Sequence, residues 1–138
     1  MSRLIVVPPR RSRSTATEGH AKALLAARTA LEKQGEDVIV LDLRSLSSVT
    51  EFFVICTAGS ARQLTALKEH LEAAFAQQAY EVWHTEGTAA APSAFNHAPQ
   101  WILMDCGDVV IHLLDHAARA FYRLEDLWAD APRIPLTL

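Results

Sequence analysis

The first half of the chain combines helically spaced apolar residues with short, continuous apolar runs. Apolar residues recur at helical spacing over Glu18–Gln34, and Gly35 provides a C-terminal stop, so this segment is predicted to be a helix. Two runs of strand length follow, at Asp37–Leu43 and Glu51–Thr57. Both are apolar on both faces, which predicts inner strands of a covered sheet.

The clearest helix begins after Ser60, a residue type that favours the N-cap position. Gln63 lies three residues later and completes a capping box, and the helix is predicted to end near Gln78. Its apolar stripe consists of Leu64, Leu67, Leu71, Ala74 and Phe75.

The second half is predicted to contain three strands and one more helix. Tyr80–His84 has the composition of a short strand, and Thr88–Gln100 is rich in Ala, Pro and Ser, as expected for a loop. Asp115 is placed to cap the last helix. The residues predicted to face inward from that helix are Phe121, Leu124, Leu127 and Trp128.

A hairpin is predicted between these segments. Its strands are Trp101–Asp105 and Val109–Leu114, and the link between them is Cys106-Gly107-Asp108. Gly107 is free to take the positive φ that a tight turn needs.

The resulting order is α-β-β-α-β-β-β-α, which predicts an α/β fold with a mixed sheet of about five strands and helices packed on it. Residues 1–17 are expected to form a basic flexible tail, because two prolines and an Arg/Ser cluster cannot build a core. Residues 18–138 are expected to form a single domain.

Charge is unevenly distributed along the chain. The net charge is −3, but residues 1–14 carry four arginines and no acid, which leaves −7 for the remainder. An acidic body repels phosphate backbones, so we expect no direct nucleic-acid binding by the folded domain and a basic protein as partner. No apolar run approaches the ~20 residues that span a membrane, so no membrane partner is expected.

The two cysteines, Cys56 and Cys106, lie far apart inside apolar runs. They form neither a CxxC pair nor a disulfide framework, which indicates a reducing compartment. We expect both to be buried as small hydrophobic residues.

The polar residues of the hairpin allow two interpretations. Asp105 and Asp108 have a spacing that suits a divalent cation, with His112 as a third ligand. Carboxylates in tight turns more often bond nearby backbone N–H groups, and the sequence has no Cys/His set of four for a structural zinc. We therefore expect turn residues and no metal.

An enzymatic interpretation rests on Gly59-Ser60, which lies between a predicted strand and a helix. Nucleotidyltransferases place a phosphate-holding turn at such a position. Metal-dependent phosphoryl transfer also needs paired carboxylates on an adjoining strand, and no Asp-x-Asp follows. We expect no enzymatic activity and no cofactor.

Trp101 opens a strand after a long loop and is expected to be partly covered. Aromatic residues at such positions often anchor interfaces, although a core tryptophan is an equal alternative from the sequence alone. Trp83 and Trp128 are predicted to be core residues.

Several ordered motifs resemble one family. They are VIVLDLRSLSSVTEFFVICTAGSARQ, the Glu86-Gly87 pair, WILMDCGDVVIH and FYRLEDLW, and together they span roughly residues 18–130. The pattern is similar to the ribosomal silencing factor family RsfS, also called Iojap. The Trp-to-Asp hairpin and the Tyr-x-Leu-Glu-x-Leu-Trp ending are its most specific parts.

The resemblance implies a nucleotidyltransferase-like fold without catalytic carboxylates. It also implies binding to the large ribosomal subunit through its protein L-fourteen, which sterically blocks association with the small subunit and represses translation. Some members of the family assist large-subunit biogenesis, and isolated members often form homodimers.

The resemblance implies a partner-binding site at the hairpin. By position, the contact residues of the family correspond to Trp101 and Cys106, and Asp105, Gly107 and Asp108 fit the same motif. This chain departs from the usual pattern in four places. Cys106 replaces a larger Leu or Tyr, Ala58-Gly59 replaces Gly-Thr, the loop at 88–100 is longer, and the arginine-rich tail is extra.

Two alternatives to a ribosome-binding regulator remain open from the sequence. One is a nucleotidyltransferase-like nucleotide-binding module or enzyme, and the other is a dimerisation domain whose hairpin packs only on itself. A bacterial cytoplasm is the favoured location. The absence of acids in the tail also resembles an organelle transit peptide.

Overall fold

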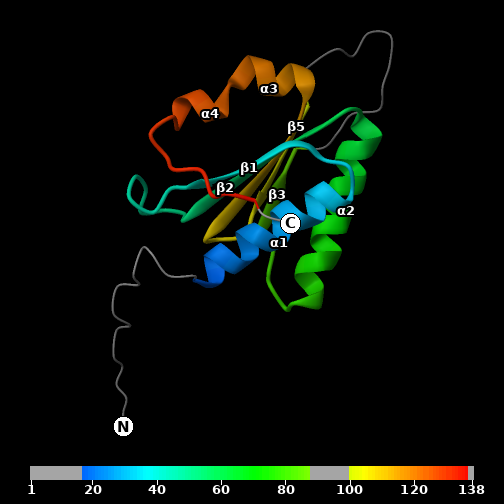
Figure 1. Cartoon of the computed structure of the whole chain (residues 1–138). Coiled ribbons are helices and arrows are strands. Elements are labelled where there is room, and N and C mark those ends of the chain that lie inside the picture. Colours follow the sequence, from blue (N-terminus) through cyan, green and yellow to red (C-terminus); the bar gives the residue numbers. More distant parts are fainter. Residues whose placement is uncertain (1–16, 88–99, 137–138) are drawn as a thin grey trace.

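A five-stranded sheet forms the centre of the protein (Figure 1). The computed structural model describes residues 17–87 and 100–136. Within them, the elements in chain order are α1 (Glu18–Glu32), β1 (Glu36–Asp42), β2 (Phe52–Ala58), α2 (Ala61–Gln77), β3 (His84–Glu86), β4 (Trp101–Asp105), β5 (Val109–Asp115), α3 (His116–Tyr122) and α4 (Leu124–Leu127).

The strand order is β1-β2-β5-β4-β3, with β2 and β5 paired in parallel and every other pair antiparallel. The chain runs from β2 to its parallel neighbour β5 through α2, β3 and β4, and α2 provides the helical crossover to the far edge of the sheet. The predicted mixed sheet with packed helices is therefore confirmed, and so is the β4–β5 hairpin.

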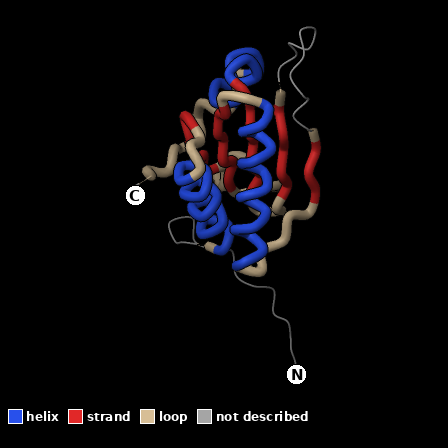
Figure 2. Tube along the Cα trace, turned by 90° about the vertical axis from the view of Figure 1, so that its right-hand side faces the viewer, coloured by secondary structure: helices blue, strands red, loops and turns tan. Residues whose placement is uncertain are grey.

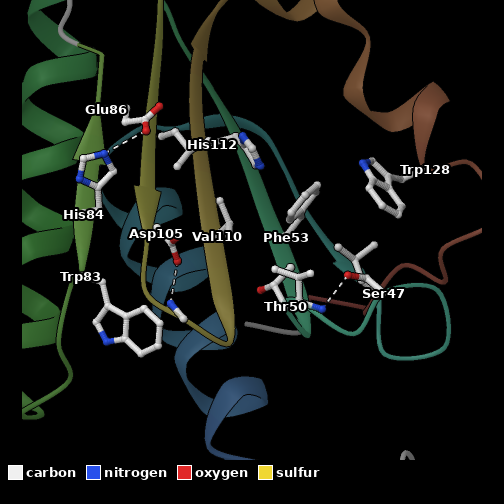
Figure 3. Close-up of a pocket in the computed structure, with 14 residues that line it drawn as sticks. Ser47, Thr50, Phe53, Trp83, His84, Glu86, Asp105, Val110, His112 and Trp128 are labelled. Carbon is white, nitrogen blue, oxygen red and sulfur yellow. Dashed lines mark hydrogen bonds and ion pairs between the residues drawn. The ribbon is translucent and has the colours of Figure 1, made fainter.

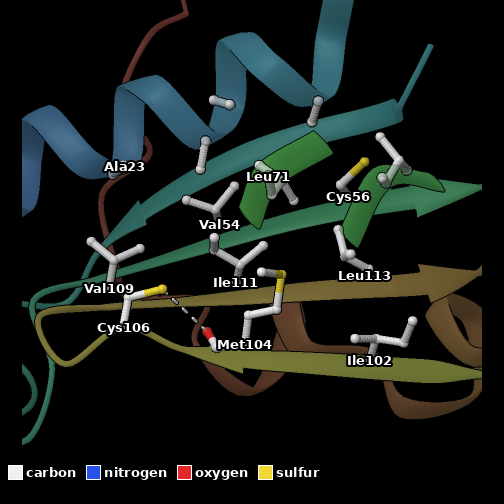
Figure 4. Packing of buried hydrophobic residues seen from close by; sticks show 14 of the residues in the cluster. Ala23, Val54, Cys56, Leu71, Ile102, Met104, Cys106, Val109, Ile111 and Leu113 are labelled. Carbon is white, nitrogen blue, oxygen red and sulfur yellow. Dashed lines mark hydrogen bonds between the residues drawn. The ribbon is translucent and has the colours of Figure 1, made fainter. Parts of the chain in front are cut away.

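Helices α1 and α2 pack side by side on one face of the sheet (Figures 1 and 2). Figure 4 shows the core between them, where side chains of α1 and α2 meet alternate residues of the central strands. Leu71, Val54 and Ile111 are fully buried there. Burial of apolar surface on this face is the main source of stability.

Helices α3 and α4 lie over the opposite face, at the end where β5 leads into α3 (Figure 1). A second, smaller cluster packs beneath them, and its buried members are Leu41, Leu43, Ile55, Leu114, Ala118, Leu124 and Ala131. Partly buried Phe53, Trp101 and Trp128 border this cluster. The rest of this face, which we call the open face, has no helix over it in the described part of the chain.

The prediction that the first strand is an inner strand is wrong, because β1 lies at one edge of the sheet. Its two-sided burial has another cause. Val40 faces the α1–α2 core, whereas Leu41 joins the second cluster. The C-terminal segment also runs along the outer edge, where Pro132 O accepts from Asp42 N at 2.8 Å and Ile134 N donates to Val40 O at 2.9 Å.

The prediction of one continuous last helix is also wrong. Arg123 has φ 52°, which ends α3 and leaves α4 as a separate short turn. Phe121 in α3 and Leu127 in α4 both point outward, contrary to the prediction, with exposed fractions of 70% and 72%. Leu124 is buried, as predicted, and Trp128 is half-buried.

Local signals placed the helix starts correctly. Ser60 Oγ accepts from Gln63 N at 3.1 Å, and Asp115 Oδ1 accepts from Ala118 N at 2.8 Å. The Gln63 side chain accepts from Gly59 N rather than from Ser60 N, so the capping box is displaced by one residue. The third strand begins at His84, later than the predicted Tyr80–His84.

Two predicted segments fall mostly outside the described residues. Of the predicted tail, residues 1–16 lie outside, and Thr17 belongs to the fold because its hydroxyl accepts from His20 N at the start of α1. Of the predicted loop, residues 88–99 lie outside. None of the helices in residues 17–87 and 100–136 is long and apolar enough to cross a membrane.

Candidate functional site

A groove of about 580 Å³ runs across the open face of the sheet (Figure 3). Its lining comes from β2, β3, β4, β5, the loop before β2 and the end of α4. We define the groove by the residues that line it, which are Leu43, Ser47, Val49, Thr50, Phe53, Trp83, His84, Glu86, Leu103, Asp105, Gly107, Val110, His112 and Trp128.

The two sides of the groove differ in chemistry (Figure 3). On the side of β2 and α4, Phe53 and Trp128 pack edge to face at 5.5 Å between ring centroids. Val49 extends this side and is 87% exposed. On the side of β3 and β4, the groove is lined by Glu86 and Asp105. The groove therefore joins a mainly apolar side, which also holds Ser47 and Thr50, to a side that carries two carboxylates.

His112 lies on the floor and fixes the position of Trp101. The indole Nε1–H of Trp101 donates to His112 Nδ1 at 3.1 Å, so the neutral imidazole carries its proton on Nε2. Burial lowers the pKa of His112 to about 4, which keeps the ring neutral at physiological pH.

Two buried polar atoms of the groove lack hydrogen-bond partners among the described residues. They are His112 Nε2 and Thr50 Oγ1. A buried polar group without a partner costs about 1–3 kcal/mol, so unpaired groups of this kind are uncommon in folded proteins. The groove is thus not a plain apolar patch.

The β4–β5 turn forms one end of the groove. Asp105 Oδ1 accepts from Gly107 N at 2.9 Å, which is the turn role predicted for this carboxylate. Gly107 has φ +86°, as predicted for the hairpin glycine. Trp83 packs directly against it, because a Cβ at Gly107 would lie 2.9 Å from the indole ring.

Three of the five predicted partner-binding residues are not among the residues that line the groove: Trp101 lies in a smaller hollow that shares Glu86 and Leu103 with it, and Cys106 and Asp108 lie away from it. Cys106 is 1% exposed and points into the α1–α2 core (Figure 4), which agrees with the predicted burial of both cysteines. Its side chain therefore offers no surface for the contact that the resemblance implies. Alternation along the strand explains this, because Ile102, Met104 and Cys106 share the inner face. Burial raises the pKa of the Cys106 thiol to about 12.

Asp108 connects the hairpin to α1. Its Oδ1 accepts from Lys22 Nζ at 3.0 Å, and its backbone oxygen accepts from Glu51 N and Phe52 N. The hydrogen bond and the negative charge of Asp108 raise the pKa of Lys22, against the opposing effect of burial. Asp108 therefore supports the turn from behind.

The residues of the alternative sites are engaged in other interactions. Asp105, Asp108 and His112 bond to three different partners and do not converge, and the described residues contain no group of three metal-ligating side chains. At the Gly59-Ser60 turn, the N–H of Gly59 donates to the Gln63 side chain. That turn bonds within its own helix start.

The structure also identifies groove residues that the sequence did not. Trp83 was predicted to lie in the core, yet it is 69% exposed at the mouth of the groove. Phe53, Leu103 and Val110 looked like ordinary strand residues. The available signal was alternation, because Leu103 shares a face with Trp101 and Asp105.

The fold and the groove together define a mixed α/β protein in which α1 and α2 cover one face of the sheet, while α3 and α4 cover only one end of the other face and leave the groove beside them. Comparisons with known proteins agree on its family. The family model "Ribosomal silencing factor during starvation" matches residues 16–138. The chain belongs to the ribosomal silencing factor (RsfS) family, as its motifs indicated.

Individual relatives give the same assignment. The chain is 35% identical to ribosomal silencing factor RsfS of Halalkalibacterium halodurans, over 81% of this chain and 89% of that protein. It is 34% identical to RsfS of Bacillus subtilis, over 78% and 85%. A crystal structure of a protein from Chromobacterium violaceum superposes with a TM-score of 0.72 at 26% identity, covering 88% of this chain and 94% of that one.

Proposed function

We propose that this protein represses translation by binding the large ribosomal subunit through ribosomal protein L-fourteen and sterically blocking association with the small subunit. Membership of the ribosomal silencing factor family supports action on the ribosome. The observation that supports a docking site is the groove on the open face, because within residues 17–87 and 100–136 no helix covers this part of the sheet.

Large side chains at the groove provide the anchors for such docking. Trp83 and Val49 are exposed in the free protein and border the groove. Trp101 lies next to it in a smaller hollow that shares Glu86 and Leu103. Burial of aromatic anchors commonly supplies most of the binding free energy at protein interfaces.

The proposed mechanism is steric and needs no chemical step. The docked domain occupies space that the small subunit needs on the joining face. Trp101, Asp105 and Gly107 contribute to the contact surface, whereas Asp108 holds the turn in position. Cys106 contributes only through the backbone of the hairpin, because its side chain is in the core.

A subunit-joining assay tests the proposal. Purified large and small subunits are mixed with increasing amounts of protein, and joined ribosomes are resolved on sucrose gradients. We expect the wild type to reduce joining. Trp101→Ala and Val49→Gln should need at least about tenfold more protein, since each removes an anchor.

Leu127→Gln is the matched control for Val49→Gln, because Leu127 is 72% exposed and Val49 is 87% exposed, but Leu127 does not line the groove. Circular dichroism shows whether each variant is folded. If the folded wild type leaves joining unchanged, the proposal fails. If only self-association responds to Trp101→Ala, the hairpin is a dimerisation surface and the proposal is also wrong.

A further inference from the structure

The N-terminal segment, residues 1–16, joins the described fold at one end of the groove. Thr17, the first described residue, donates its hydroxyl to Glu51 Oε1 at 3.1 Å. Glu51 donates its backbone N–H to Asp108 O at 2.9 Å. Asp108 follows Gly107, which lines the groove. The N-terminal segment is therefore attached beside the β4–β5 turn.

The groove lies within reach of this segment. A chain of n residues spans at most about 3.3–3.6 Å × n, so Val7, ten positions before Thr17, can lie up to about 35 Å from it. The groove extends from β2 to β3 across β5 and β4, and at about 4.8 Å per strand this distance is about 14 Å. The length of the segment thus permits contact with both sides of the groove.

The N-terminal segment combines two kinds of side chain. Residues 4–7 are the apolar run Leu-Ile-Val-Val, and three arginines follow within residues 10–13. Residues 1–14 carry four arginines and no acid, against a net charge of −7 for the remainder of the chain. Opposite charges attract the segment to its own domain, and the covalent link gives this attraction a high effective concentration.

The groove has a counterpart for each kind of side chain. Phe53 and Trp128 lie on its apolar side, Glu86 and Asp105 line the β3–β4 side, and neither Lys nor Arg is among the described residues that line it. The side chain of Glu86 is 65% exposed. Asp105 uses one acceptor position for Gly107 N, and a carboxylate offers about four. Both carboxylates can therefore accept hydrogen bonds from arginine.

We propose that residues 4–13 occupy the groove of their own molecule, with the apolar run against Phe53 and Trp128 and the arginines against Glu86 and Asp105. The segment then acts as an internal competitor that any partner of the groove has to displace. The contact itself is a property of the isolated protein and goes beyond the proposed function. Only the competition with a ribosomal partner rests on that function.

The contact is tested on the full chain by paramagnetic relaxation in NMR. A nitroxide is attached at Ser12→Cys. Cys56 and Cys106 are buried, and burial raises the pKa of each thiol to about 12, so the label reacts with the new cysteine. Signal broadening is measured at the backbone amides of Phe53 and Val110, with the amides of α2 on the covered face as the reference.

The matched control carries the same label together with Ile5→Ser and Val6→Ser, which leave the net charge unchanged. Attachment at Thr17 is the same in both proteins, so a difference between them reports the contact alone. Losing two apolar side chains should lower the ratio of bound to unbound segment at least about tenfold, and broadening in the groove should be largely lost. Salt should also reduce the broadening in the unsubstituted segment, because it screens the arginine–carboxylate pairs.

The competition is tested by binding to isolated large ribosomal subunits. The double serine variant, without a label, should bind at least about threefold more tightly than the wild type, because a larger fraction of its grooves is unoccupied. Circular dichroism confirms that both proteins are folded.

The outcomes separate the inference from the proposed function. Equal broadening with and without the serine substitutions would overturn the inference, whatever the subunits do. Broadening that depends on residues 4–7, with no binding to subunits by either protein, would support the internal contact and overturn the proposed function. Weaker binding of the serine variant to subunits would show that the segment itself contacts the ribosome, and would overturn its role as a competitor.

Discussion

The two faces of the sheet show how one set of strands serves two purposes. Along β4, Ile102 and Met104 are buried under α1 and α2, whereas the alternating Trp101, Leu103 and Asp105 are half-buried on the open face. The covered face holds the fold together. The open face carries aromatic and acidic groups that contribute less to stability and are accessible to a partner.

Substitutions that change stability and substitutions that change binding should therefore fall at alternating positions along a strand. A substitution on the covered face removes contacts that the folded chain needs. A substitution on the open face removes contacts that form only with a partner. The two kinds of substitution should differ most in the free energy of unfolding.

Leu71→Ala should have the largest effect. Leu71 is fully buried between α2 and the sheet, so the variant loses buried area and leaves a cavity, at a cost of about 2–5 kcal/mol. Leu103→Ala, on the half-buried open face, should cost about 1 kcal/mol. Urea denaturation of both variants measures this, and equal losses would contradict the distinction between the faces.

His112 should make stability depend on pH. Its pKa is about 4 in the folded protein and about 6.5 when unfolded, so the unfolded chain binds more protons between these values. Stability should therefore fall as the pH drops from about 6.5 to about 4, by up to about 3 kcal/mol.

The matched variant for this prediction is His112→Gln, which keeps an acceptor for Trp101 but does not titrate. The difference in unfolding free energy between the wild type and this variant should shrink by about 3 kcal/mol from pH 7 to pH 4. Other titrating groups cancel in that difference. A constant difference across this range would show that His112 is not held neutral by burial.

Gly107→Ala should have a smaller effect, about 1–2 kcal/mol, because alanine is strained at positive φ and its Cβ meets the Trp83 ring. Trp83→Ala alone should cost less than about 0.5 kcal/mol, since the indole is mostly exposed. The two changes together should cost less than their sum, because removing the ring leaves only the backbone strain. Thermal unfolding of all four proteins completes the cycle, and strict additivity would contradict the Trp83–Gly107 contact.

The sequence predicted features that depend on local chemistry. The caps at Ser60 and Asp115, the hairpin glycine and the turn role of Asp105 all follow from residues within a few positions of each other. The mixed sheet followed from the order of elements. The place of Trp101 after a long loop suggested a partly covered position, with a core position as an equal alternative, and the structure has it half-buried.

Features that depend on distant parts of the chain were not predictable in the same way. Trp83 is exposed because it covers Gly107, a residue 24 positions later, instead of entering the core. The sequence of β1 did not identify it as an edge strand, because residues 132–134 cover its outer edge. No glycine or proline marks the break at Arg123. The apolar periodicity therefore predicted one continuous helix with Phe121 facing inward, whereas Phe121 is exposed.

The most direct test of the docking surface compares two exposed aromatic residues. Trp83 and Phe121 are equally accessible, at 69% and 70%, but only Trp83 lines the groove. The wild type, Trp83→Ala and Phe121→Ala are sedimented with isolated large ribosomal subunits. The groove account predicts that Trp83→Ala loses at least about tenfold in affinity while Phe121→Ala binds like the wild type. Unchanged binding of Trp83→Ala, or a loss confined to Phe121→Ala, would contradict it.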